Sequence, residues 1–249
     1  MNTLNVKFIT NQAEAAKSIQ SLLEPSSFFK EEASKIIFAE HPELKNIDIS
    51  DKKALLNYVE SVFSAHSDDI KSAIDIYTKE WKKVEANIGV CLSEILNTKL
   101  EGFDKVIGNI GIIQIYPRDL QEKTFDLYYK EYPYYAIATA LHEVTHFFYA
   151  KKWLELFPND KIEYLEAPHA FWHLSEIMVP IINSEESLRR LIPDADIKSY
   201  NDYDIPYNKD PTNTSIYGFF VKNYFEYKNK GKTIEEFLKF SRGIIEKLF

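Results

Sequence analysis

The sequence has little of several features that mark whole classes of protein. It contains one cysteine, Cys91, which excludes an internal disulfide framework and favours a reducing compartment. No apolar run approaches the roughly 18 residues that a membrane-spanning helix needs. The first residues also lack the basic and apolar regions of a signal peptide. We therefore expect a cytoplasmic protein with no membrane partner.

Basic clusters and nucleotide-binding motifs are absent as well. The chain has 30 Lys and Arg against 38 Asp and Glu, a formal net charge of −8. An acidic balance without a basic cluster argues against nucleic acid as a partner. Neither a phosphate-binding glycine loop nor the Gly-x-Ser-x-Gly elbow of serine hydrolases occurs. The sequence therefore indicates neither of those two kinds of active site.

The order of the elements can be read from the spacing of apolar residues. Hydrophobic residues make up 45 % of the 249, which is enough for a packed core. A short strand is predicted at 4–10, helices to about residue 97, strands at 106–117 and 124–129, and helices afterwards except for a loop at about 192–212. We predict a predominantly helical α+β fold, with a helical N-terminal region at 1–98 and a core at 99–249 that contains a small sheet.

The stretch ATALHEVTHFFYAKKW, residues 138–153, contains the pattern HExxH. On a helix His142 and His146 lie one turn apart on the same face, so both imidazoles can reach one ion. Glu143 is rotated about 100° from His142, where its carboxylate can take a proton from a water on the metal. The residues around the pattern are uncharged, and burying these polar groups in an apolar helix is costly unless a partner satisfies them. The motif therefore predicts a metal site with its own catalytic base.

With HEVTH the chain resembles the zincin metallopeptidases. The resemblance covers the motif helix and, loosely, the strand before it and the helix after it, but not the first hundred residues. It implies a zincin-like core, one zinc ion per chain bound by His142 and His146, and Glu143 as the residue that activates water. It also implies a peptide or protein substrate that pairs with an edge strand, here about residues 110–116.

Two glutamates of the sequence compete as the third metal ligand. Tyr149 and Lys152 stand where the metzincin branch needs Gly and His, so that branch is excluded. The resemblance to the gluzincin branch implies a glutamate from a following helix. Glu166 lies 19 residues after His146, a spacing common in that branch, and Glu176 lies 29 residues after it.

We favour Glu176 because of its place on a predicted helix at 168–183. That helix is apolar over most of its surface, and its polar residues form one narrow stripe of His169, His173, Glu176 and Asn183. Such a stripe is expected to face something buried and polar. Glu166 lies outside that helix, and it remains the alternative ligand together with His173 or His169.

The group that stabilises the oxyanion is a Tyr or His from beyond the third ligand in the zincin family. Tyr217 is the candidate by this resemblance, with Tyr203 and Tyr207 as rivals. His173 is a second candidate, either for the oxyanion or for supporting a ligand through a hydrogen bond.

The predicted function is that of a zinc metallopeptidase. A non-catalytic metal-binding or partner-binding protein on a zincin-like scaffold is the alternative, and a fourth protein donor such as His173 would favour it. A deformylase-like amidohydrolase with Cys91 as a ligand is a distant third. The sequence GVCLS around that cysteine departs from the deformylase pattern, and Cys91 lies in a predicted helix.

Overall fold

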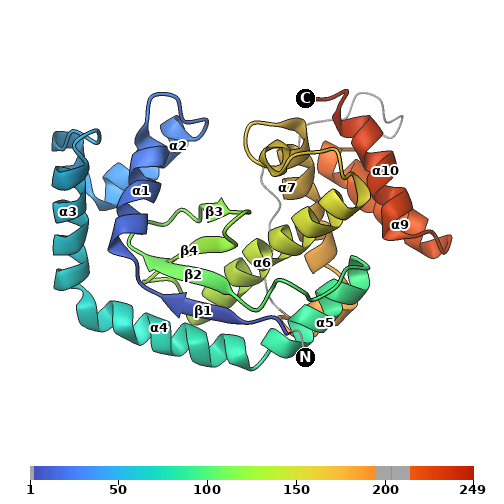
Figure 1. The fold of residues 1–249 in the computed structure, drawn as a ribbon, viewed down its shortest axis with the longest axis horizontal. Helices are drawn as coiled ribbons and strands as arrows, with labels where there is room; N and C mark the ends of the chain where they lie inside the picture. Colours follow the sequence, from blue (N-terminus) through green and yellow to red (C-terminus); the bar gives the residue numbers. More distant parts are fainter. Residues whose placement is uncertain (1–2, 194–202, 204–213) are drawn as a thin grey trace. The chain divides into compact units, whose positions relative to one another are not determined.

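The computed structural model describes residues 3–193, 203 and 214–249, and it is predominantly helical with one small mixed sheet (Figure 1). The predicted α+β class is therefore confirmed. None of the described helices combines the length and the apolar character needed to cross a bilayer. The elements are, in chain order, β1 Val6–Ile9, α1 Gln12–Leu23, α2 Lys30–Glu40, η1 Pro42–Asn46, α3 Lys52–Ala65, α4 Ser67–Lys82, α5 Glu85–Ile95, β2 Val106–Gly111, β3 Arg118–Asp119, β4 Thr124–Tyr128, α6 Pro133–Leu156, η2 Ile162–Leu165, α7 Ala170–Asn183, α8 Glu186–Arg189, α9 Ile216–Asn229 and α10 Ile234–Ile245.

The chain forms two compact units, and both are discontinuous in the sequence. The first combines residues 1–85 and 102–140, and the second combines residues 86–101 and 141–249. The division predicted from the sequence, into 1–98 and 99–249, remains a prediction. Each unit is described by itself.

The first unit is built around a four-stranded sheet in the order β1-β2-β4-β3. The pairs β1–β2 and β2–β4 are parallel, and only the short β3 runs antiparallel to its neighbour. Because successive side chains of a strand point to opposite faces, the two faces of the sheet differ. Phe8 packs against Tyr77 and Trp81 of α4, whereas Asp126 accepts a hydrogen bond from Ser18 of α1 at 2.8 Å. The two helices therefore cover opposite faces (Figure 1).

One glycine of β2 is required by the packing of this sheet. Gly108 is paired with Phe8 on one side and with Phe125 on the other. A Cβ atom at position 108 would lie 2.6 Å from a ring carbon of Phe8, which is closer than real contacts. The phenyl rings of both neighbouring strands therefore occupy the space that a side chain at 108 would need.

The position of β2 corrects one prediction. Residues 110–116 were expected to form an edge strand that pairs with an extended substrate. Instead β2 ends at Gly111 and lies between β1 and β4, so its hydrogen-bonding groups are used on both sides. The prediction was wrong because an isoleucine-rich run is equally compatible with a central and with an edge strand.

The second unit is helical, and α7 lies at its centre. This helix packs against η2, α9 and α10, and its residues from Phe171 to Asn183 are buried except His173. Arg242 of α10 contacts the segment that follows α6. Its guanidinium donates to Asp160 at 2.9 and 3.1 Å and lies 4.4 Å from the ring centre of Phe157. This pairing and stacking tie α10 to the chain that leaves α6.

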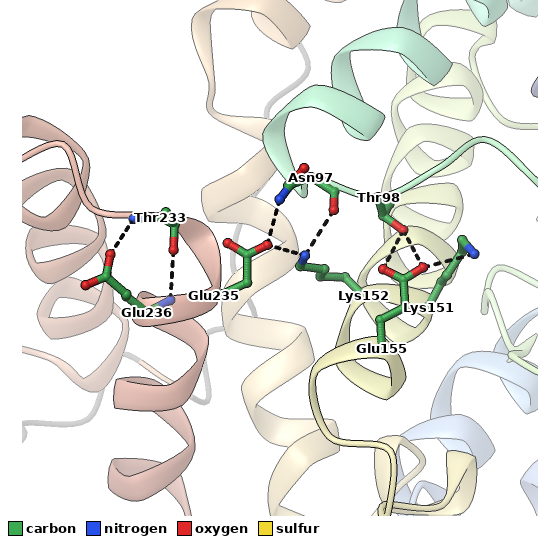
Figure 2. Close-up of polar contacts among 8 residues, drawn as sticks. All are labelled: Asn97, Thr98, Lys151, Lys152, Glu155, Thr233, Glu235 and Glu236. Atoms are coloured by element: carbon green, nitrogen blue, oxygen red, sulfur yellow. Dashed lines mark hydrogen bonds and ion pairs between the residues drawn. The ribbon is translucent and has the colours of Figure 1, made fainter.

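A buried lysine of α6 links this helix to the segment after α5 and to α10 (Figure 2). The side chain of Lys152, 7 % exposed, donates to the backbone oxygen of Asn97 at 3.0 Å and to the carboxylate of Glu235. Asn97 Nδ2 donates to the same carboxylate at 2.8 Å. The charge of the lysine is therefore paired and hydrogen-bonded, as a buried ammonium group requires.

The carboxylate of Glu235 gives the stability of this unit a predictable dependence on pH. Burial alone would raise its pKa, but hydrogen bonds, chiefly from Lys152, outweigh burial and lower the pKa from 4.5 to about 2. A carboxyl group with a lowered pKa stabilises the fold above its unfolded pKa, and this stabilisation is lost as the pH falls through the folded pKa. We expect Glu235→Gln to lower the free energy of unfolding at pH 7 by about 1–2 kcal/mol, because a partly exposed charged hydrogen bond is lost.

This difference between Glu235→Gln and the wild type should shrink as the pH falls from 4.5 to about 2. Denaturant unfolding of both proteins at a series of pH values measures it. A difference that stays constant over this range would show that the charge of Glu235 does not contribute.

Candidate metal centre

The motif helix α6 is surrounded by protein at the HExxH stretch. Leu141, Val144, Phe147, Tyr149 and Ala150 are all buried, and these positions are distributed around the helix axis. A helix whose neighbours occupy all sides places its polar side chains in the interior. His146 is 1 % exposed in its side chain, and His142 is 18 % exposed.

The helix α7 supplies the third member of the site. It covers most of the helix predicted at 168–183 and starts after the N-cap residue His169. The side chain of Glu176 is 3 % exposed. A carboxylate buried this deeply needs compensation by charge or hydrogen bonds.

The structure brings His142, His146 and Glu176 together. The two Nε2 atoms lie 3.0 Å apart. Glu176 Oε2 is 3.8 Å from His142 Nε2, and Glu176 Oε1 is 3.6 Å from His146 Nε2. One ligand atom from each residue lies within 4.8 Å of the others, so this buried group could hold a metal ion. It is the one group of this kind among the described residues.

The two distances to Glu176 suit an ion better than direct hydrogen bonds, whereas the 3.0 Å between the two Nε2 atoms is also a hydrogen-bond distance. A tetrahedral zinc ion with ligand bonds of about 2.0–2.1 Å separates neighbouring ligand atoms by about 3.3 Å. The three observed separations, 3.0, 3.6 and 3.8 Å, lie around that value. A charged hydrogen bond between imidazole and carboxylate would instead be about 2.7–2.9 Å long. Two imidazole nitrogens and one carboxylate oxygen therefore fit a divalent cation in both chemistry and spacing.

Glu143 is the neighbour of the first ligand, and it is also buried, with 4 % exposure. It belongs to the same turn of α6 as both histidines but points in another direction, since each residue of a helix is rotated by about 100°. Its carboxylate thus lies inside the protein rather than on a solvated helix face.

The other residues of the α7 stripe lie outside the three-residue group. His173 Nδ1 lies 2.9 Å from the hydroxyl of Tyr203, and its ring stacks on Phe249 with centres 3.8 Å apart. His169 is exposed and packs against the ring of Tyr164. Glu166 follows η2 and is half-buried, and it does not belong to the group.

The structure describes two of the three tyrosines that the sequence offers for the oxyanion, Tyr217 and Tyr203. Tyr217 lies in the first turn of α9 and is half-buried. Tyr203 is the partner of His173. Tyr207 lies outside the described residues. Cys91, on α5, is a half-buried free thiol and is not a member of the three-residue group.

Sequence reasoning missed a contact that links the two helices of the site. Thr145 of α6 and Asn183 of α7 are joined by a buried hydrogen bond of 2.7 Å. The signal was present, because Asn183 belongs to the polar stripe of α7 and Thr145 lies within the motif. Only the tertiary packing shows that they meet.

Comparisons of the chain with protein-family models, with curated proteins and with solved structures found no match. The functional argument therefore depends on the residues and geometry of the site.

Proposed function

We propose that this chain is a zinc-dependent metallopeptidase with a zincin-like core. One observation supports the proposal most strongly. The side chains of His142 and His146 from α6 and of Glu176 from α7 lie close together in the protein interior. Two histidines and one glutamate are the ligand set of thermolysin-type catalytic zinc sites. We propose one zinc ion per chain at this site and a peptide or protein as the substrate.

The bound zinc ion would supply Lewis acidity, which polarises a carbonyl group and lowers the pKa of water. Glu143 then acts as the general base: its carboxylate accepts a proton from the attacking water and passes it to the leaving amine. Its buried position favours this role, because charged groups interact more strongly where water is excluded. Tyr217 or His173 would donate a hydrogen bond to the developing oxyanion.

The number of donors favours catalysis over a purely structural metal site. Structural zinc sites are normally closed by four protein ligands, whereas catalytic sites use three and keep one position for water or substrate. Among the described residues the group has three members. A structural site also has no need of Glu143. A non-catalytic metal-binding protein remains the second candidate, and the activity measurement below separates the two.

Removal and return of the metal test this proposal. We expect about one zinc per chain in dialysed, untagged protein, measured by plasma mass spectrometry. Cleavage of a mixed peptide library, followed by mass spectrometry, should stop when a chelator removes the zinc and resume when zinc is added back. Protein that retains no metal even after added zinc would refute the metal centre. Retained metal without cleavage of any peptide would identify the non-catalytic alternative.

A further inference from the structure

The hydrogen bond between Thr145 and Asn183 directly joins the two helices that carry the metal ligands. Thr145 lies one residue before His146 on α6, and Asn183 lies two helical turns after Glu176 on α7. Both residues are almost completely buried, with 0 % and 1 % exposure. Neither side chain can exchange this bond for one with bulk water, so breaking the bond leaves a buried polar group without a partner.

The number of hydrogens on the Thr145 hydroxyl and on the Asn183 amide determines which of them donates in the hydrogen bond between them. Thr145 Oγ1 lies 2.7 Å from the backbone oxygen of Leu141 and also 2.7 Å from the amide oxygen of Asn183. A hydroxyl group has one hydrogen, so it can donate to only one of these oxygens. The amide nitrogen of Asn183 is buried and has no hydrogen-bond partner in the part of the chain that the structure describes. With the amide turned over, this nitrogen donates to Thr145 Oγ1 while the hydroxyl donates to Leu141, so the hydroxyl hydrogen and the amide nitrogen each have an acceptor.

Pro180 lies on α7 between Glu176 and Asn183, so the hydrogen bond of Asn183 with Thr145 affects the position of Glu176. Pro180 lies inside α7, four residues after Glu176. Proline has no backbone N–H, so the carbonyl of Glu176 receives no helical hydrogen bond from residue 180. Helices bend most readily at such a position. The ligand Glu176 and the anchor Asn183 thus lie on opposite sides of the weakest point of the helix.

We propose that Thr145 and Asn183 are positioning residues of the metal centre, an inference that depends on the metal site proposed above. Their hydrogen bond prevents α7 from sliding or bending relative to α6 across Pro180. It thereby keeps the Glu176 carboxylate at 3.6 and 3.8 Å from the two imidazole nitrogens, the spacing that suits a shared ion. Neither residue contacts the ion, and each acts through the helix that carries a ligand.

The test compares Thr145→Val, which has nearly the same shape but no hydroxyl, with Thr145→Ser, which keeps the hydroxyl. Ser241→Ala is a matched control, because the Ser241 hydroxyl is 0 % exposed and donates at 2.8 Å to the carbonyl four residues earlier, as Thr145 does, but within α10. The zinc dissociation constant is measured by competition with a chromophoric chelator. The visible absorption of the cobalt(II)-loaded proteins reports the ligand geometry independently of activity.

We expect Thr145→Val to weaken zinc binding by about 10- to 100-fold, the usual effect of losing a group that orients a ligand. It should also change the cobalt spectrum. Thr145→Ser and Ser241→Ala should bind zinc within about threefold of the wild type, even though Ser241→Ala loses a buried hydrogen bond. If Thr145→Val fails to fold, Asn183→Leu replaces it in the same comparison.

Two results would overturn the proposal in distinguishable ways. Wild-type protein that binds no zinc would remove the metal centre itself. Zinc binding by the wild type together with equal affinities of Thr145→Val and Ser241→Ala would leave the metal centre intact and refute the positioning role.

Discussion

Glu143→Gln is expected to lower kcat for peptide hydrolysis by about 10²- to 10⁴-fold, the usual contribution of a general base. The substitution removes the proton acceptor but keeps the size of a side chain that is 4 % exposed. Because Glu143 is not one of the three proposed ligands, the variant should still contain one zinc per chain. Steady-state kinetics and plasma mass spectrometry on the same preparation measure both quantities.

A control for Glu143→Gln is available on the same helix. Glu155 of α6 is a surface residue whose carboxylate pairs with Lys151 and Thr98. Glu155→Gln should leave kcat and zinc content unchanged. Loss of zinc in Glu143→Gln would mean that Glu143 is a ligand rather than the base. Unchanged kcat would assign the proton transfer to another residue.

Glu176→Ala is expected to weaken zinc binding by more than about 100-fold, beyond the effect of groups that only orient a ligand. The substitution removes one of three donors from a place where the side chain is 3 % exposed, so bulk water cannot easily take its position. After dialysis the variant should retain almost no zinc, and its hydrolytic activity should disappear as well. Glu166→Ala is the matched control, since Glu166 is the competing candidate from the sequence.

The comparison of these two variants decides the third ligand. Retention of zinc in Glu166→Ala with loss in Glu176→Ala would support the ligand set that the structure brings together. The reverse result would assign the third ligand to Glu166. It would require a different arrangement of the segment before α7 when metal is bound.

Local features of the fold could be predicted from the sequence. The helices before residue 97, the strand at 124–129 and the motif helix appear in the structure as α1 to α5, β4 and α6. Their patterns depend on helical spacing, on β-branched and aromatic residues, and on Pro133 in a first helical turn. The polar stripe of α7 also led to Glu176 as the favoured ligand, because a narrow polar stripe on an apolar helix indicates a buried polar neighbour.

Features that depend on pairing between distant segments could not be predicted. The apolar run of β2 does not reveal which strands lie beside it, and its place between β1 and β4 follows from the arrangement of the whole sheet. The contact of Thr145 with Asn183 likewise could not be predicted, because the motif and the polar stripe of α7 indicate polar residues on each helix but not which of them meet.

The parallel pairing of β1 with β2 has a consequence for synthesis on the ribosome. Val6 pairs with Val106, and the chain between them contains α1 to α5. At about 5–20 residues per second, β1 is synthesised about 5–20 s before its partner strand. The early helices can form local contacts during that time, but the first strand has no neighbour and its backbone groups stay open to other chains. Aggregation of nascent chains is therefore expected to begin at residues 6–9, and a chaperone that acts early would be needed there most.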